Sequence, residues 1–408
     1  MKICDSFLRF VILLFISSFH VWNCVETPLN HDLSHSELEP DTLVINDISG
    51  ANYRVAPSLG SNERLYVGNK NGIDVPLSLI KIGSGYWNYS FDSTISIDSL
   101  RFILYSNDSL LSEVSTPKLF YSPDTQFNEN NSTYLDFIDF SFSDWSDLGQ
   151  ANIKVNTDTT DTSSSYTYTE LIWNVDTLLA SLSDTLDSNL VRTFAIQLAN
   201  SDSNFIELFS EEATQGDKDP KIIMYYRRTI TSSDSTLIDT NSATIYSDGD
   251  LSIIDPSGIE PYLNKLGLSN GLGLRSVLNI SFNEASLPEG SIIRSGNLIL
   301  NSDTSLTPVN YNIIIDPLDS DTSVVDSVSI YSSDPYDAIG YPYRVSSDSE
   351  NGVYVIQIKN ILQNISLGNE SNIGFKLLAN EKNDPFESAW FDFQIGPSPK
   401  LEIIYVAN

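Results

Sequence analysis

The sequence predicts an all-β protein in which two tandem antiparallel β-sandwich domains, jelly-roll-like in layout, follow a signal peptide. Beyond residue 41, short runs of Val, Ile, Leu, Phe and Tyr are broken about every eight to twelve residues by Asn, Asp, Ser, Gly or Pro, as in sandwiches and barrels. Several runs, such as 352–358, alternate apolar with polar side chains, which places one strand face in a core and the other in water. An internal repeat divides the chain into two halves.

The first 23 residues have the features of a secretory signal peptide. Lys2 and Arg9 precede an apolar stretch that runs from Phe10 to Ile16, which is far shorter than a membrane-spanning helix. No later apolar stretch in the sequence reaches the length of a membrane-spanning helix either. We therefore expect an extracellular or cell-surface protein without a transmembrane span.

Cys24 stands just beyond this apolar stretch and opens a polar tether at residues 24–40. A bacterial lipoprotein carries its lipidated cysteine at this place, but Trp22 and Asn23 depart from the small residue that the lipoprotein signal requires. Two outcomes stay open: lipidation of Cys24, with anchoring to the outer membrane, or simple cleavage and release.

The repeat is visible at both ends of the two halves. Arg64-Leu65-Tyr66-Val67-Gly68-Asn69 matches Lys265-Leu266-Gly267-Leu268-Ser269-Asn270 at an offset of 201 residues. Pro220-Lys221-Ile222-Ile223-Met224-Tyr225-Tyr226 matches Pro399-Lys400-Leu401-Glu402-Ile403-Ile404-Tyr405 at an offset of 179. The change of offset indicates that the loops between the matched strands differ in length.

These matches predict β-sandwich domains at residues 41–228 and 241–408, joined by a Ser/Thr/Asp-rich linker at residues 229–240. Val175 to Leu182 and Asn360 to Ile365 are the exceptions to the strand pattern, because their apolar spacing of three or four residues is typical of a helical turn.

The matched segments resemble the DNRLRE-type domain of bacterial extracellular proteins. In the second half, Arg275 opens an apolar run, Leu287-Pro288-Glu289-Gly290 supplies a turn, and residues 295–300 follow as a strand. In the first half, Asp74 stands where Arg275 stands in the second. The resemblance implies a β-sandwich from a group that includes a carbohydrate-binding module family, and it says little about activity.

The composition excludes several classes of chemistry. A net charge of −32 disfavours nucleic acid, anionic lipid and acidic polysaccharides as partners. All three histidines and both cysteines lie within the first 35 residues, so the folded body has no imidazole or thiolate for catalytic triads, zinc or haem. We expect no enzyme, no catalytic residues and no cofactor.

Aromatic residues beside turns are the candidates for ligand binding. Tyr86, Trp87 and Tyr89 follow a Gly-Ser-Gly turn, and Tyr341 and Tyr343 follow Gly340. Exposed rings could stack on sugars, while strand-edge tyrosines also cap sandwich cores. Trp145, Trp173 and Trp390 are predicted to be core residues.

Acidic turns could supply oxygen ligands to a structural calcium ion. The candidates are Asp248-Gly249-Asp250 and the group of Asp316, Asp319 and Asp321. Neither follows the full spacing of a known calcium loop, so ordinary turn chemistry is preferred and no metal site is assigned.

Three functions remain. The first is a non-catalytic secreted or surface-anchored structural or adhesion protein of bacterial type, which contacts other surface proteins. The alternative is a carbohydrate-binding protein for a neutral glycan, and a glycan-degrading enzyme ranks last.

Overall fold

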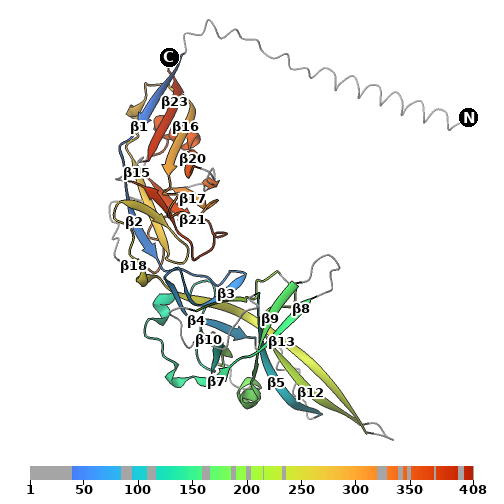
Figure 1. Cartoon of the computed structure of the whole chain (residues 1–408). Helices are drawn as coiled ribbons and strands as arrows, with labels where there is room; N and C mark the ends of the chain where they lie inside the picture. Colours follow the sequence, from blue (N-terminus) through green and yellow to red (C-terminus); the bar gives the residue numbers. More distant parts are fainter. Residues whose placement is uncertain are drawn as a thin grey trace, which may run out of the picture.

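The computed structural model describes residues 39–83, 94–107, 116–158, 166–184, 190–198, 204–214, 216–231, 236–318, 329–338, 343–346, 351–371, 374–393 and 399–407. The predicted all-β class is confirmed, because these described residues form several sheets in which all strand pairs but one are antiparallel. Two β units lie end to end (Figure 1). We call residues 64–255 the first unit, and residues 40–55 with 265–406 the second unit.

The first unit is a set of strands that share one long member, β13. Its elements are β3 (Arg64–Lys70), β4 (Ile73–Ile82), β5 (Ile95–Ser106), β6 (Pro117–Ser122), η4 (Tyr134–Phe137), η5 (Phe142–Asp144), β7 (Ser146–Gln150), β8 (Asn152–Asp158), β9 (Tyr166–Asn174), η6 (Asp176–Leu178), α2 (Leu179–Leu182), β10 (Thr193–Leu198), β11 (Phe205–Phe209), β12 (Lys221–Thr231) and β13 (Thr236–Asp255). The strand order is β7-β6-β10-β4-β13-β12-β5-β9-β8, and β3 joins β4 to β11.

The second unit contains two larger sheets and a two-stranded one. Its elements, with the turn that leads into it, are β1 (Pro40–Ile45), β2 (Ile48–Val55), η8 (Pro256–Gly258), β14 (Lys265–Leu268), β15 (Leu274–Ile280), η9 (Glu284–Ser286), β16 (Ile292–Asn301), β17 (Asn312–Pro317), β18 (Ile330–Tyr331), β19 (Tyr343–Ser346), β20 (Val353–Gln357), α3 (Lys359–Ser366), β21 (Phe375–Ala379), β22 (Ala389–Asp392) and β23 (Lys400–Val406). The strand orders are β1-β23-β16-β20, β18-β2-β15-β21-β17-β19 and β14-β22.

Local sequence accounts for most of these elements. In β20, Tyr354 and Ile356 are buried while Val355 between them is exposed, as strand alternation requires. The two expected helical turns are η6 with α2, and α3. Within the described ranges, no helix is long and apolar enough to cross a membrane.

The chain order of the units differs from the predicted tandem order. β1 and β2 precede the first unit along the chain, but they pair with β23 and β15 of the second unit. β13 separates the two copies of the repeat, and it pairs with β12 and β4 of the first unit. Residues 40–55 therefore belong to the second unit and residues 236–255 to the first, unlike the predicted boundaries at 228 and 241.

Within the segment predicted as a linker, residues 229–231 and 236–240 lie in the paired strands β12 and β13. Thr229 pairs with Ile238, and Thr231 pairs with Thr236, across β12 and β13. Thr and Ile have high β propensity, so a polar composition that is typical of linkers is here compatible with an exposed two-stranded ribbon.

A buried hydrogen-bond network locates the long strand in the first unit. The hydroxyl of Ser78 on β4 donates to the carbonyl of Tyr66 at 2.6 Å and lies 2.9 Å from the hydroxyl of Ser252 on β13. The Ser252 hydroxyl also accepts from the backbone N–H of Tyr66 at 2.8 Å. β13 is thus fixed to β3 and β4.

The second unit repeats this network with β2 in the place of β13. The hydroxyl of Ser276 on β15 contacts the carbonyl of Gly267 at 3.0 Å and the Oδ1 atom of Asn52 at 2.8 Å. The same Oδ1 accepts from the backbone N–H of Gly267 at 2.9 Å. Gly267 is the repeat partner of Tyr66, so Asn52 on β2 takes the place of Ser252 on β13. The strand that precedes each copy of the repeat therefore completes the other unit.

The two units share an apolar core at their junction. It consists of Leu59, Tyr66, Ile73, Val75, Ile254, Leu272, Leu274, Phe386 and Trp390. The Tyr66 and Phe386 rings meet edge to face with centroids 4.9 Å apart. Beside them, Lys70 Nζ lies 2.7 Å from a carboxylate oxygen of Asp384. The junction therefore has the apolar contacts of a folded interior, with a partly exposed ion pair at its side.

Two segments cross between the units, residues 56–63 from β2 to β3 and residues 256–264 from β13 to β14, and Arg54 links them. It lies next to the last residue of β2, is 5% exposed, and donates from Nη1 to the carbonyl of Pro256 at 2.9 Å. Its Nη2 donates to the carbonyl of Ile259. The start of the first crossing segment is thus hydrogen-bonded to the second crossing segment.

We expect Arg54→Ala to lower the free energy of unfolding by about 2–4 kcal/mol, because the buried carbonyl of Pro256 and the partly buried carbonyl of Ile259 lose charged donors. Urea denaturation of the full chain measures this change. Arg294→Ala, at an exposed position of the second unit, is the matched control and should change stability by at most about 0.5 kcal/mol. Equal losses in the two variants would contradict this role for Arg54.

Candidate functional site

The predicted ligand-binding aromatics fall largely beyond what the structure describes. Tyr86, Trp87, Tyr89 and Tyr341 lie outside the described residues. Tyr343 lies in β19, but its side chain is not among those described. Cys24, Asp319 and Asp321 are outside as well, and Asp316 lies in β17. The predicted aromatic site therefore remains a prediction.

The predicted core tryptophans are located more clearly. Trp173 and Trp390 are 1% and 5% exposed, as expected. Trp145 is only half-buried, and it packs with Phe140 and Phe142 in an aromatic layer formed by residues 127–145. This layer covers the outer face of the sheet that contains β4, β10 and β13.

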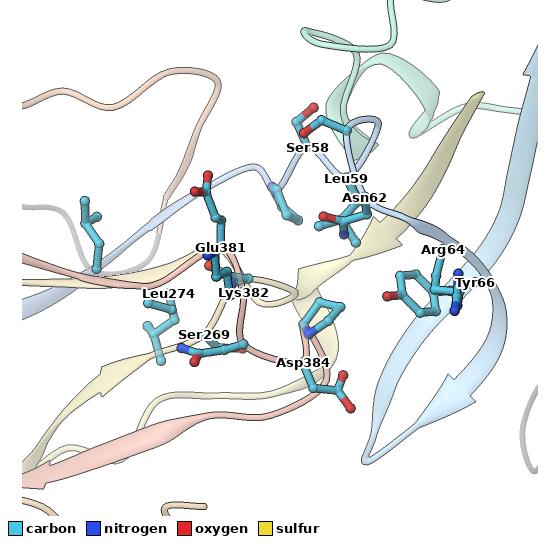
Figure 2. A pocket seen from close by; sticks show the side chains of 18 of the residues that line it. Ser58, Leu59, Asn62, Arg64, Tyr66, Ser269, Leu274, Glu381, Lys382 and Asp384 are labelled. Atoms are coloured by element: carbon cyan, nitrogen blue, oxygen red, sulfur yellow. The ribbon is translucent and has the colours of Figure 1, made fainter. Parts of the chain in front are cut away.

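A cleft lies between the two units and is the first candidate site. Its volume is about 910 Å³, near the upper end of the roughly 300–1,000 Å³ that is typical of small-molecule sites. Ser58, Asn62 and Arg64 line one side, and Glu381 and Lys382 line the other (Figure 2). The side chains of these residues offer both donors and acceptors of hydrogen bonds.

The charge of the cleft is nearly balanced, in contrast to that of the whole chain. Four acidic residues (Glu63, Glu207, Glu381, Asp384) and three basic residues (Arg64, Arg275, Lys382) line it. Arg64 is already paired with Glu207, at 3.1 Å between Nε and Oε1. A neutral polar ligand matches this lining better than a polyanion.

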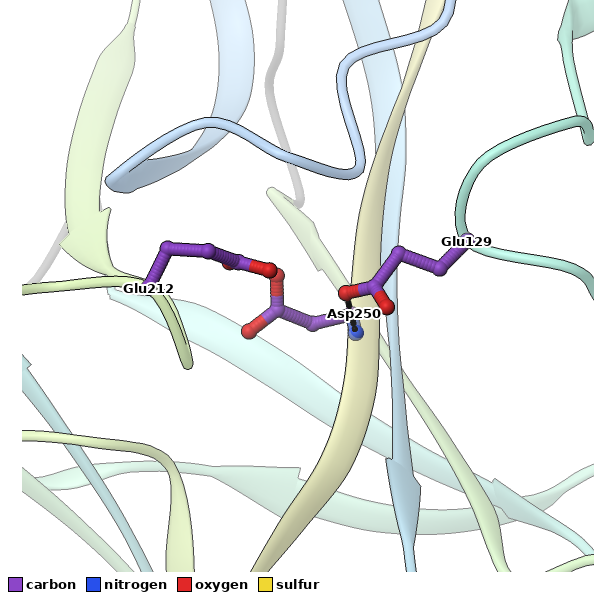
Figure 3. A group of neighbouring side chains, drawn as sticks. All are labelled: Glu129, Glu212 and Asp250. Carbon is purple, nitrogen blue, oxygen red and sulfur yellow. Dashed lines mark hydrogen bonds between the residues drawn. The ribbon is translucent and has the colours of Figure 1, made fainter.

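The second candidate site is a group of three carboxylates in the first unit, which we call the carboxylate cluster. Glu129 comes from the loop between β6 and η4, Glu212 from the turn after β11, and Asp250 from β13. One carboxylate oxygen from each lies within 4.8 Å of the others. Figure 3 shows the three side chains converging.

Two glycines allow these segments to approach each other. Gly249 has a φ of +139° and stands in the β13 bulge between Ser247 and Asp250. This bulge leaves the N–H of Asp250 free to donate to Glu129 Oε1 at 3.0 Å. A Cβ atom on Gly60 would lie 2.0 Å from the carbonyl oxygen of Glu129, so the inter-unit crossing rests directly on the Glu129 loop.

Two carboxylate oxygens of the cluster are left without a hydrogen-bond donor. Asp250 is fully buried, and its Oδ2 accepts from the N–H of Glu211 at 2.7 Å. Asp250 Oδ1 and Glu212 Oε2 are buried without a hydrogen-bond partner. Among the described residues, no salt bridge includes Glu129, Glu212 or Asp250. The negative charge of the cluster is therefore uncompensated by side chains that the structure describes.

Burial and mutual repulsion shift the acidities of the cluster. Burial raises the pKa of Asp250 well above its ordinary value, and the charges of Glu212 and Glu129 act in the same direction. Burial also raises the pKa of Glu212. The pKa of the adjacent Glu211 is raised to about 7, first by burial and then by the charge of Glu129. The ionised cluster is thus unfavourable in the folded state.

Comparisons with known proteins add no family to these observations. No family model matches the sequence, and no curated protein matches it.

In the presence of a chelator at pH 8, Asp250→Asn should raise the free energy of unfolding by about 1–2 kcal/mol, because an uncompensated buried charge is removed. The asparagine oxygen can still accept from Glu211 N–H. Thermal or urea denaturation measures the effect. Asp248→Asn, at the exposed neighbouring position, is the control and should change little. Destabilisation by Asp250→Asn under these conditions would refute the electrostatic description of the cluster.

Proposed function

We propose that this chain is a non-catalytic structural or adhesion protein of an extracellular surface. The observation that carries the proposal is the exchange of strands between the two units. Units that complete each other cannot separate without breaking sheet hydrogen bonds, and such a rigid two-unit body suits a protein that carries mechanical load or displays a surface. The predicted export signal, the acidic composition and the resemblance to DNRLRE-type domains support the extracellular placement.

The positions of the strands favour one orientation of the two units relative to the cell surface. Pro40 pairs with Val406 at one pole of the second unit. The β12–β13 hairpin projects from the first unit toward the opposite end (Figure 1). An anchor preceding residue 39, such as a lipidated Cys24, would therefore hold the second unit near the cell and present the hairpin outward.

The described end of the β12–β13 ribbon has the composition of a contact surface. Ile230, Leu237 and Ile238 are 47%, 61% and 61% exposed near the end of this ribbon. Ile230 and Leu237 are direct cross-strand partners. Ile230 and Leu237 therefore share one face of the ribbon, while Ile238, the next residue along β13, points to the other face. Exposed apolar side chains commonly mark interaction sites, so we place the adhesive contact at this end of the ribbon.

The burial of Asp250 in the carboxylate cluster supports a function without catalysis. A glycosidase needs two carboxyl groups on either side of an accessible glycosidic bond. Asp250 is fully buried, so it cannot contact a glycan in this fold.

A second candidate function, capture of a neutral glycan, is favoured by the inter-unit cleft. Its volume suits a few sugar units, and its lining offers many hydrogen-bonding groups with little net charge. Tyr66 at its base is 7% exposed, so hydrogen bonds rather than ring stacking would dominate the binding.

We expect beads coated with the triple variant I230S/L237S/I238S to bind an alkyl-coated surface at less than half the level of the wild-type chain. Leu263 lies just before β14 and is 95% exposed, so Leu263→Ser is the control and should bind like wild type. The cleft would be the binding site instead of the hairpin if three results were found together. The triple variant would bind like wild type, soluble neutral polysaccharide would block binding, and Asn62→Ala/Lys382→Ala would abolish it.

A further inference from the structure

We propose that the carboxylate cluster is a calcium site that fastens the loop at residues 123–145 to the body of the first unit. Glu129, Glu212 and Asp250 would each supply carboxylate oxygen to one Ca²⁺ ion. This site is independent of the adhesive surface proposed above, since it lies away from the β12–β13 tip.

The unpartnered oxygen of Asp250 is the observation that points to an ion. Asp250 is fully buried, its Oδ1 has no hydrogen-bond partner, and its carboxylate faces that of Glu212 (Figure 3). Leaving a buried carboxylate oxygen unpaired is costly. Glu212 Oε2 is buried and unpartnered in the same way, so two free acceptors converge where the described residues provide no cation.

The donor set selects the class of ion. All three ligands are carboxylates, and oxygen ligands suit Ca²⁺ and Mg²⁺ rather than softer metals. Histidine and cysteine are absent after residue 35. The three ligand atoms lie within 4.8 Å of one another, and a site that takes three carboxylates from the protein is more typical of Ca²⁺ than of Mg²⁺, which usually keeps several waters and binds one or two carboxylates.

The three ligands belong to segments far apart along the chain, so the ion would act as a crosslink. Glu129 and Asp250 are 121 residues apart. The Glu129 loop leads into the aromatic layer that covers β4, β10 and β13. Ser58 on the inter-unit crossing also contacts the carbonyl of Asn130 at 3.3 Å. Occupancy of the site would therefore hold both the aromatic layer and the crossing in place.

The test is a calcium titration of the full chain after removal of divalent ions. Isothermal titration with CaCl₂ should show one saturable site, and the melting temperature should rise with CaCl₂ more than with equimolar MgCl₂. Asp250→Asn and Glu212→Gln should each lower the calcium affinity at least tenfold, while Asp248→Asn and Glu284→Gln, at exposed acidic positions, keep it. The mutant panel separates a specific site from general screening of an acidic surface.

Chymotrypsin digestion supplies a second readout at the loop itself. Calcium should slow cleavage near Phe137 and Phe140 in the wild-type chain but not in Glu129→Gln, which changes a half-buried loop residue and leaves the sheet intact. The proposal is overturned if CaCl₂ gives no saturable binding, if Mg²⁺ acts equally well, or if Asp250→Asn and Glu212→Gln bind calcium like wild type.

Discussion

The exchange of strands between the two repeats is the constraint on which the rest of this structure depends. β1 and β2 close the second unit, and β13 closes the first. The same buried serine network occurs in both, with Ser252 and Asn52 in equivalent places. Neither unit has its full set of strands until distant parts of the chain have met, so the fold is dominated by non-local pairing, and we expect it to form slowly.

This exchange explains why the junction is packed like a core. Two chain segments cross between the units, and the residues beside them form the shared apolar cluster around Tyr66 and Phe386. Arg54 joins one crossing to the other through backbone carbonyls. The Glu129 loop supports the first crossing at Gly60. The inter-unit cleft and the carboxylate cluster are therefore both positioned by the way the chain passes from unit to unit.

The sequence was sufficient to predict what depends on local pattern. Apolar alternation predicts strands such as β20, and apolar spacing predicts a helical turn at residues 360–365, which the structure shows as α3 (Lys359–Ser366). The repeat correctly matches β3 with β14 and β12 with β23. Which strand completes which unit could not be predicted in this way, because β1–β2 and β13 precede equivalent repeats and are compatible with either partner. Composition at residues 229–240 was misleading, since exposed β ribbons and linkers are both rich in Ser, Thr and Asp.

The carboxylate cluster, like the strand exchange, could be predicted from the sequence only in part. The turn at Asp248-Gly249-Asp250 is visible in the sequence as a possible source of oxygen ligands, and Asp250 is indeed one member. Glu129 and Glu212 have no local signal, because only the tertiary fold brings their loops to the β13 bulge. The predicted aromatic residues remain predictions, since their side chains lie beyond what the structure describes.

Disulfide trapping tests the strand exchange most directly. In a chain with Cys4 and Cys24 replaced by serine, Thr42→Cys should crosslink with Ile404→Cys within one monomer, because residues 42 and 404 are direct partners of β1 and β23. The simple tandem arrangement would instead place residue 42 beside Tyr225, the repeat counterpart of Ile404. Efficient crosslinking of Thr42→Cys with Ile404→Cys, and not with Tyr225→Cys, is the predicted result; the opposite preference would contradict the exchange.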